Sequence, residues 1–169
     1  GTTTLLPIDI RRLPWVRRLA ADYAFDHDSV AAFFAGNPAD PPAWRDAVAR
    51  TQRHPQRRDA IADILEAQQR RRGAPPSALL AAATLRDPQT VAVVTGQQAG
   101  LFGGPLFTLL KALTVLRLAE RTAAEHGVPT VAVFWIDAED HDWNEVKRCG
   151  GLDGEHNLVR IAPDELALI

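Results

Sequence analysis

Two short β-branched runs flank one long apolar helix in this chain, and this arrangement restricts the fold most. Thr90–Thr95 reads TVAVVT and Thr130–Ile136 reads TVAVFWI, and both are typical of strands that are buried on both faces. Between them, a glycine-rich loop at residues 96–104 precedes a helix that Pro105 begins at its first position and Gly127 ends. This order predicts a right-handed βαβ unit with a parallel pair of strands.

The residues before this unit predict helices. Four helices are expected, separated by glycine and proline breaks, at residues 29–35, 43–52, 56–72 and 77–85. We therefore expect residues 1–88 to form a helical leader that packs on the core, and residues 89–169 to begin that core as one domain. A weaker hairpin is expected after the second strand, between residues 146–149 and 157–161, with Gly150-Gly151 and Asp153-Gly154 in its connection.

Composition narrows the class of protein. The 169 residues suit a single domain, and 46% of them are hydrophobic, which is enough to build a core. A net charge of -2 argues against a general nucleic-acid binder, whose surface would be strongly basic. Cys149 is the single cysteine, so no internal disulfide forms, which fits a reducing compartment. No apolar run approaches the roughly 20 residues of a membrane span, and we expect a cytoplasmic protein without membrane or nucleic-acid partners.

The predicted sheet is too small to be complete. Two parallel strands and one crossover helix do not make a doubly wound sheet, because parallel sheets need several strands and cover on both faces. The chain also lacks methionine and ends within the apolar run Leu166–Ile169. We therefore expect an α/β fold in which the core is truncated.

The glycine-rich loop is a candidate anion site. It follows a strand and precedes a helix, so its backbone N–H groups and the positive end of the helix could hold a negative group. Its spacing matches neither the dinucleotide nor the P-loop fingerprint. The alternatives are a tight connection without a ligand and a lysine at the edge of a packed helix. The candidate binding residues are Thr95, Gly96, Gln97, Gln98, Gly103, Gly104, Thr108 and Lys111.

An acidic cluster follows the second strand directly. Its members are Glu139, Asp140, His141 and Asp142, at the carboxyl end of a parallel strand, where open α/β sheets bind ligands. Neighbouring carboxylates repel each other, which raises some of their pKa values and produces candidate acids and bases, with His141 a candidate general base. Divalent-metal binding and a surface turn with helix capping are the alternatives. We favour a catalytic role without a metal.

Taken together, these segments resemble the cysteine-adding enzymes of bacillithiol biosynthesis, the BshC type. The resemblance covers most of the chain and is specific through the combination of its motifs rather than through any one of them. The segments that carry it are Phe33–Pro38, Thr95–Gln98, Gly100–Leu101, Gly103–Thr108, Lys111–Ala112, Phe134–Trp135 and Glu139–Asp142.

The resemblance implies a ligase that adds L-cysteine to glucosaminyl-malate through an amide bond, the last step towards the thiol bacillithiol. It implies a Rossmann-like core, similar to that of class I nucleotidyltransferases, and a C-terminal coiled coil that forms a homodimer. The family's proteins are longer than this chain, so these residues alone are expected to be inactive. The energy source stays open, with ATP or another nucleotide as the candidate. A non-catalytic ligand-binding or assembly module on the same scaffold is the rival interpretation.

Overall fold

The structure is a computed structural model that describes residues 8–54, 57–139 and 143–162. Contacts along the chain divide it into two compact units, Gly1–Arg53 and His54–Ile169. Helices that we expected in the leader therefore fall into both units. The packing of residues 1–88 as a whole on the core stays a prediction.

The first unit consists of short helices joined by turns, without a strand among its described residues. Its aromatic centre joins Tyr23 and Phe34, whose ring centroids lie 4.5 Å apart, with His27 beside both rings. The helix expected at residues 29–35 is instead a 3-10 helix that begins two residues earlier. The elements of this unit are η1 (Ile10–Arg12), α1 (Arg18–Phe25), η2 (His27–Phe33) and α2 (Pro41–Arg53).

The second unit begins with two packed helices, α3 (Arg58–Arg71) and α4 (Pro76–Thr84). They confirm the helices predicted at residues 56–72 and 77–85, within the described part of each. Gly73 ends the first of them with φ at +64°, a left-handed conformation that favours glycine. Pro76 stands at the start of α4, where a missing N–H costs nothing.

One of two arginines that hold the turn between α4 and the first strand is Arg58. Arg58 Nη1 donates hydrogen bonds to the carbonyl oxygens of Leu85 (3.3 Å), Asp87 (3.2 Å) and Thr90 (3.0 Å). Thr90 itself is 1% exposed, and its hydroxyl donates to the carbonyl oxygen of Thr84 at 2.7 Å. The start of the sheet is thereby tied to the start of α3, 32 residues earlier in the sequence.

A second arginine binds the same turn to the outer side of α3. The Arg86 guanidinium donates to the carboxylates of Glu66 and Asp63, and Arg70 also reaches Glu66. The hydrogen bond from Arg86, supported by the one from Arg70, lowers the pKa of Glu66 below its ordinary value. This carboxylate is therefore ionised at neutral pH and holds both cations.

Replacement of Arg58 by methionine is expected to lower the free energy of unfolding by about 2 kcal/mol, because a charged donor to three carbonyl groups is lost. Urea unfolding of both proteins measures this difference. The neighbouring Arg57, whose side chain is exposed and does not cap α3, provides the control. Its replacement by methionine is expected to change the free energy by no more than about 0.5 kcal/mol. Equal losses in the two variants would mean that the carbonyl contacts are not the cause.

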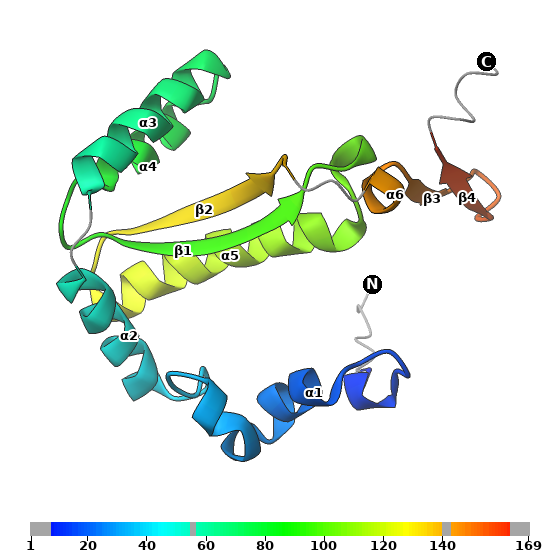
Figure 1. The fold of residues 1–169 in the computed structure, drawn as a ribbon, viewed down its shortest axis with the longest axis horizontal. Coiled ribbons are helices and arrows are strands. Elements are labelled where there is room, and N and C mark those ends of the chain that lie inside the picture. The colour runs from blue at the N-terminus through cyan, green and yellow to red at the C-terminus, as the bar shows by residue number, and fades with distance from the viewer. Residues whose placement is uncertain (1–7, 55–56, 140–142, 163–169) are drawn as a thin grey trace, which may run out of the picture. The chain divides into compact units, whose positions relative to one another are not determined.

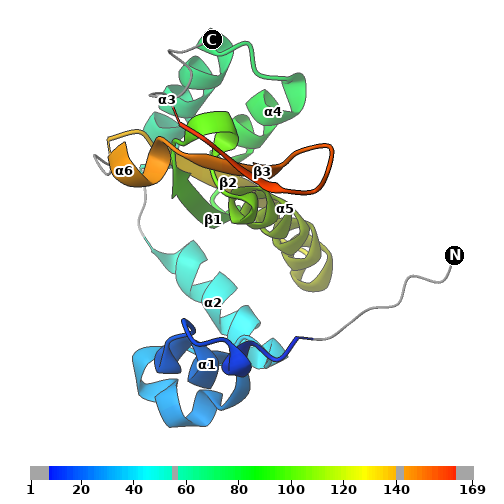
Figure 2. The same ribbon diagram turned by 90° about the vertical axis from the view of Figure 1, so that its right-hand side faces the viewer.

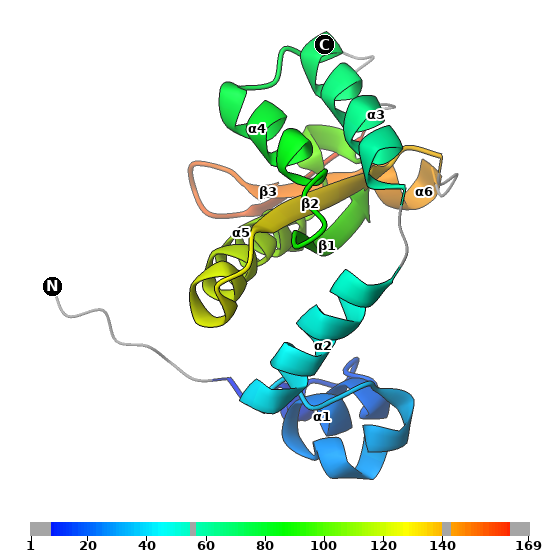
Figure 3. The ribbon, with the colours of Figure 1, turned by 90° about the vertical axis from the view of Figure 1, so that its left-hand side faces the viewer.

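The sheet consists of β1 (Val91–Gln98) and β2 (Thr130–Asp137), joined by the long helix α5 (Leu106–His126). The two strands are parallel and run in continuous register from the pair Val91–Thr130 to the pair Gln98–Asp137. Helix α5 covers one face of the sheet, and α3 and α4 lie over the other (Figure 1, Figure 3). The predicted βαβ unit is thus confirmed, and its buried contacts are made by Val91, Val115, Ala119 and Val131.

Two boundaries of this unit differ from the prediction. The first strand continues to Gln98, because Gly96–Gln98 keep pairing with the end of β2, so the predicted loop at 96–104 is strand in its first part. The 3-10 turn η3 (Leu101–Gly103) follows. Pro105 is the residue before α5 rather than its first residue, since its ψ of 158° is extended. Gly127 ends the helix with φ at +63°, as predicted.

After β2 come α6 (Trp143–Val146) and a hairpin of β3 (Cys149–Leu152) and β4 (Leu158–Ile161), which pair antiparallel (Figure 2). The hairpin is confirmed, but its first strand begins three residues later than predicted and includes both glycines. The reason is the turn: the Asp153 carboxylate accepts the N–H of Glu155 (2.9 Å) and of Asn157 (2.8 Å). These bonds, above all the one from Asn157, lower the pKa of Asp153. They also place the turn of the hairpin at residues 153–157.

In the part of the chain that the structure describes, no helix is both long and apolar enough to span a membrane.

Candidate functional site

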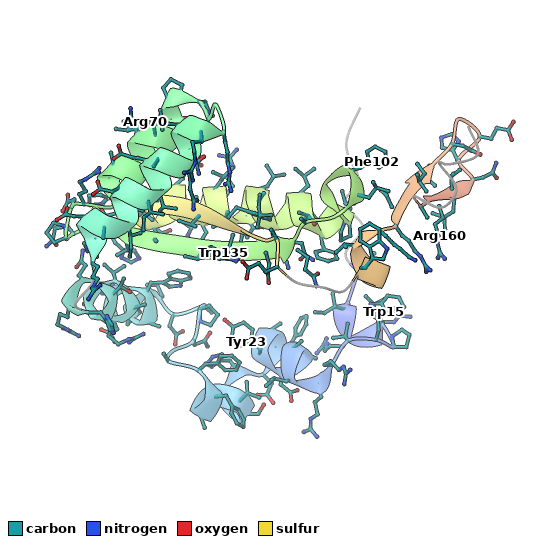
Figure 4. All side chains as sticks on the ribbon, turned by 45° about the horizontal axis from the view of Figure 1, so that its top comes forward. Trp15, Tyr23, Arg70, Phe102, Trp135 and Arg160 are labelled. Atoms are coloured by element: carbon teal, nitrogen blue, oxygen red, sulfur yellow. The ribbon has the colours of Figure 1, made fainter. Side chains whose placement is uncertain are left out.

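The carboxyl end of β1 lies unusually close to β2. Gly96 pairs with Trp135, and a Cβ atom on Gly96 would lie 2.7 Å from the Trp135 carbonyl oxygen and 3.0 Å from its Cβ. Both distances are shorter than ordinary van der Waals contact, and one of the two atoms is backbone. Only glycine fits here without moving the strands apart. Figure 4 shows Trp135 on β2 at this end of the sheet.

Lys111 of α5 binds the same strand end. Its Nζ donates to the Gln97 side-chain oxygen at 2.8 Å and to the Gly96 carbonyl oxygen at 3.3 Å. The ammonium group also lies 5.0 Å from the centre of the Phe107 ring. The Gln97 amide in turn donates to the side-chain oxygen of Gln98 at 3.1 Å. The structure thus brings four predicted site residues together, namely Gly96, Gln97, Gln98 and Lys111. Lys111 stabilises the end of β1 through its hydrogen bonds.

The turn between β1 and α5 is built on left-handed backbone. Phe102, Gly103 and Gly104 have φ values of 52°, 87° and 83°. A Cβ atom on Gly100 would lie 2.9 Å from the Gly104 Cα, so the turn closes tightly on itself. In Figure 4, Phe102 projects from this turn ahead of α5. The first turn of α5 then begins without a side-chain cap, which leaves its N–H groups to other partners.

A pocket of about 280 Å³ opens between this turn and the segment that enters the hairpin. We call it the α5 pocket. Of the eight predicted binding residues, Gln97, Gln98 and Gly104 line it, and the other five do not. Its lining residues are Gln97, Gln98, Gly100, Gly104, Pro105, Leu106, Phe107, Val146, Arg148, Cys149 and Gly150.

Arg148 is the functional candidate that the sequence interpretation missed. It lies 50 residues beyond Gln98 and belongs to no recognisable motif. It reaches the pocket because the chain after β2 passes through α6 and brings Arg148 beside the start of α5 as it enters β3. The sequence would have placed Arg148 at the entrance to the hairpin only if the first hairpin strand had been predicted to begin at Cys149. The predicted start, residue 146, is three residues too early. Cys149, the single cysteine of the chain, lines the same pocket and is half-buried.

A second, larger hollow of about 600 Å³ lies on the other face of the sheet, between β2 and the two helices α3 and α4. We call it the β2 groove. Most of its lining is apolar, with Ile61 and Ile64 from α3 and Trp135 from β2. Asp137, the last residue of β2, and Glu139, two residues beyond it, form its acidic end.

The predicted acidic cluster is described only in part. Glu139 is exposed and lines the β2 groove, whereas Asp140, His141 and Asp142 lie outside the described residues. Gln98 and Asp137 are partners in the register, so the α5 pocket and the acidic end of the β2 groove begin at the same level of the sheet. Among described residues, no group of three or more His, Cys, Asp or Glu side chains is placed to hold a metal ion.

Comparison with known proteins gives this arrangement a family. Residues 6–164 match the family described as "Bacillithiol biosynthesis BshC, N-terminal Rossmann-like domain". This match covers nearly the whole chain and includes both strands, α5 and the hairpin.

Individual relatives agree with the family match. A protein of Salinibacter ruber is 43% identical over 141 residues, which are 83% of this chain and 25% of that protein. A protein of Koribacter versatilis is 37% identical over 162 residues, 93% of this chain and 29% of that protein. Both carry the name "Putative cysteine ligase BshC". The chain spans about a quarter of the length of these curated relatives, and it belongs to the BshC family through its N-terminal Rossmann-like domain.

Proposed function

We propose that this chain supplies the first part of the active site of a cysteine ligase. The reaction joins the carboxyl group of L-cysteine to the amino group of glucosaminyl-malate and completes bacillithiol. The observation that carries the proposal is the continuous parallel register of β1 and β2. It places Gln98 beside Asp137 at the carboxyl ends of both strands. Ligands of open α/β sheets bind at this edge. The proposed setting is a cytoplasmic homodimer of the longer protein.

The chemistry needs a base and an activated acid. A C–N bond forms between the glucosamine nitrogen and the cysteine carboxyl carbon. The bond from that carbon to one carboxyl oxygen breaks, this oxygen leaves on the phosphate of the activating nucleotide, and the nitrogen gives up a proton. The amine attacks only when neutral, so a nearby base is required. Glu139 and the neighbouring residues Asp140, His141 and Asp142 are the proposed groups that hold the amine and accept its proton. ATP or another nucleotide is the proposed source of activation for the carboxyl group.

The test is a mass-spectrometric assay of the full-length protein with glucosaminyl-malate, cysteine and ATP. We expect a product whose mass is the sum of the two substrates less one water. Replacement of His141 by alanine is expected to lower its rate of formation by about 100-fold or more, the usual contribution of a general base. If well-folded protein forms no product with any nucleotide, the ligase proposal is wrong for this member of the family.

A non-catalytic assembly module is the second candidate, and one observation favours it. Helix α5 exposes about half of the surface of Leu109, Leu113 and Leu116, at 56%, 51% and 51%. Such leucines are typical of a face that another element covers. A melting temperature that rises with protein concentration would support assembly, whereas a rise on adding cysteine or glucosaminyl-malate would support a ligand site.

A further inference from the structure

The two openings at the end of the sheet differ in the charge of their described lining. Among the described residues that line it, the α5 pocket contains one cation, Arg148, and no carboxylate. The described lining of the β2 groove contains Asp137 and Glu139 against one cation, Arg72. The first opening therefore attracts anions, and the acidic end of the second attracts cations. Since both begin at the Gln98–Asp137 pair, one molecule with an acidic end and an amino end can lie across the edge of the sheet.

Arg148 is available for an anion. Its side chain is exposed, and it forms no ion pair with any described residue. Guanidinium groups bind carboxylates through two parallel hydrogen bonds, which makes such a pair both strong and selective. The amide group of Gln97 adds a further donor to the lining.

The wall of the α5 pocket opposite Arg148 also favours an anion. It is made by Pro105, Leu106 and Phe107, the beginning of a helix of 21 residues without a side-chain cap. The start of such a helix carries about half a positive charge. With about 280 Å³, the pocket is slightly smaller than the roughly 300 Å³ at which sites for drug-sized ligands begin. It therefore suits a small acidic group rather than a whole sugar conjugate.

We propose that Arg148 binds the carboxylates of the malyl end of the acceptor substrate and thereby selects acceptors that carry this dicarboxylate. This inference rests on the proposed ligase function and adds a specificity-determining residue to it. The malyl end occupies the α5 pocket, and the glucosamine extends over the end of β1 towards Asp137 and Glu139. Its amino group then lies on the acidic side, where the proton has to be removed.

The first test measures steady-state rates of the full-length enzyme. Replacement of Arg148 by glutamine is expected to raise the KM for glucosaminyl-malate about 10-fold to 100-fold, the factor that corresponds to a lost charge-assisted hydrogen bond. The KM for cysteine is expected to change less than about twofold, since cysteine does not use this pocket. R148K retains the charge but not the planar fork, and we expect an intermediate KM. If the KM for cysteine rises instead, or both rise equally, the assignment is overturned.

A binding experiment separates this inference from the ligase proposal. Calorimetry with full-length protein, without cysteine or nucleotide, compares glucosaminyl-malate with methyl glucosaminide, which has no carboxylate. R148Q is expected to weaken binding of the first about tenfold or more and to leave binding of the second unchanged. This result would support the role of Arg148 even if no product forms. Equal affinities of wild type and R148Q for glucosaminyl-malate would overturn it.

The matched control is Arg160, which lies in β4 opposite Gly150 and does not line the α5 pocket (Figure 4). R160Q makes the same change of charge in the same hairpin. We expect its affinity and both of its KM values to equal those of the wild type. Circular dichroism and melting temperature show whether each variant is folded. If R148Q does not fold, R148K is compared with the wild type instead. A loss in R160Q as large as that in R148Q would overturn the assignment, because general charge rather than the pocket would then be responsible.

Discussion

Gly96→Ala is expected to lower the free energy of unfolding by about 2–3 kcal/mol, at the upper end of the usual cost of overpacking. The added methyl group would lie 2.7 Å from the Trp135 carbonyl oxygen, which is part of the backbone and cannot turn away. The strands must separate at the pair Gly96–Trp135, and the hydrogen bonds on either side weaken with them. Urea unfolding followed by circular dichroism gives the difference. A valine at the same position is expected to cost more than alanine.

The control for this experiment is Gly151→Ala. Gly151 also lies in a strand, and no atom comes within 4 Å of the position of its added Cβ. We expect a change of no more than about 0.5 kcal/mol, as for other surface substitutions. A Gly96 variant as stable as this control would show that the end of the sheet yields easily, and the argument from close approach would fail.

Lys111→Met is expected to reduce kcat/KM of the full-length protein in the proposed ligase reaction about 10-fold to 100-fold, the equivalent of the 1.5–3 kcal/mol typical of a hydrogen bond to a charged group. Lys111 holds the Gln97 side chain and the Gly96 carbonyl group, and Gln97 in turn holds Gln98. Without the ammonium group, the Gln97 side chain, which lines the α5 pocket, loses its charged partner. Methionine retains most of the apolar stem, but the contact of the ammonium group with the Phe107 ring is lost as well.

Two further variants isolate this effect. Arg117→Met removes a cation from the same helix, where it pairs with Glu120 on the exposed side, and is expected to leave kcat/KM within about twofold. Lys111→Arg restores the charge and should recover part of the activity. If K111M and R117M lose activity equally, the loss comes from the charge of the helix and not from the strand end.

The fold could be predicted because its strongest signals are local. The β-branched runs at 90–95 and 130–136 and the apolar helix between them permit few topologies, and right-handed crossover leaves one. Gly127 ends α5 in the conformation that the sequence indicates. The predictions that were wrong concern the ends of strands, which depend on pairing with another strand. Residues 96–98 look like loop because of their composition, but pairing with β2 makes them strand.

The site was predictable to a smaller degree for the same physical reason. Gln97, Gln98 and Lys111 stand close in sequence to a recognisable strand–helix connection, and they do lie together. Arg148 joins them through tertiary structure alone, by the path of the chain from α6 into β3. The role of Lys111 also depends on geometry: a lysine near the start of a helix suggests an anion, yet here its partners are two oxygen atoms of β1.

The unbroken register of β1 and β2 limits where this chain can change in length. Eight consecutive pairs join the strands without a bulge. One residue added to either strand would turn every later side chain to the opposite face, so that Gln98 would no longer stand level with Asp137. Insertions and deletions are therefore excluded from both strands and from the tight turn at residues 100–104, and the connection at residues 127–129, before β2, is where the length can change. The spacing from each strand start to the site is thus fixed.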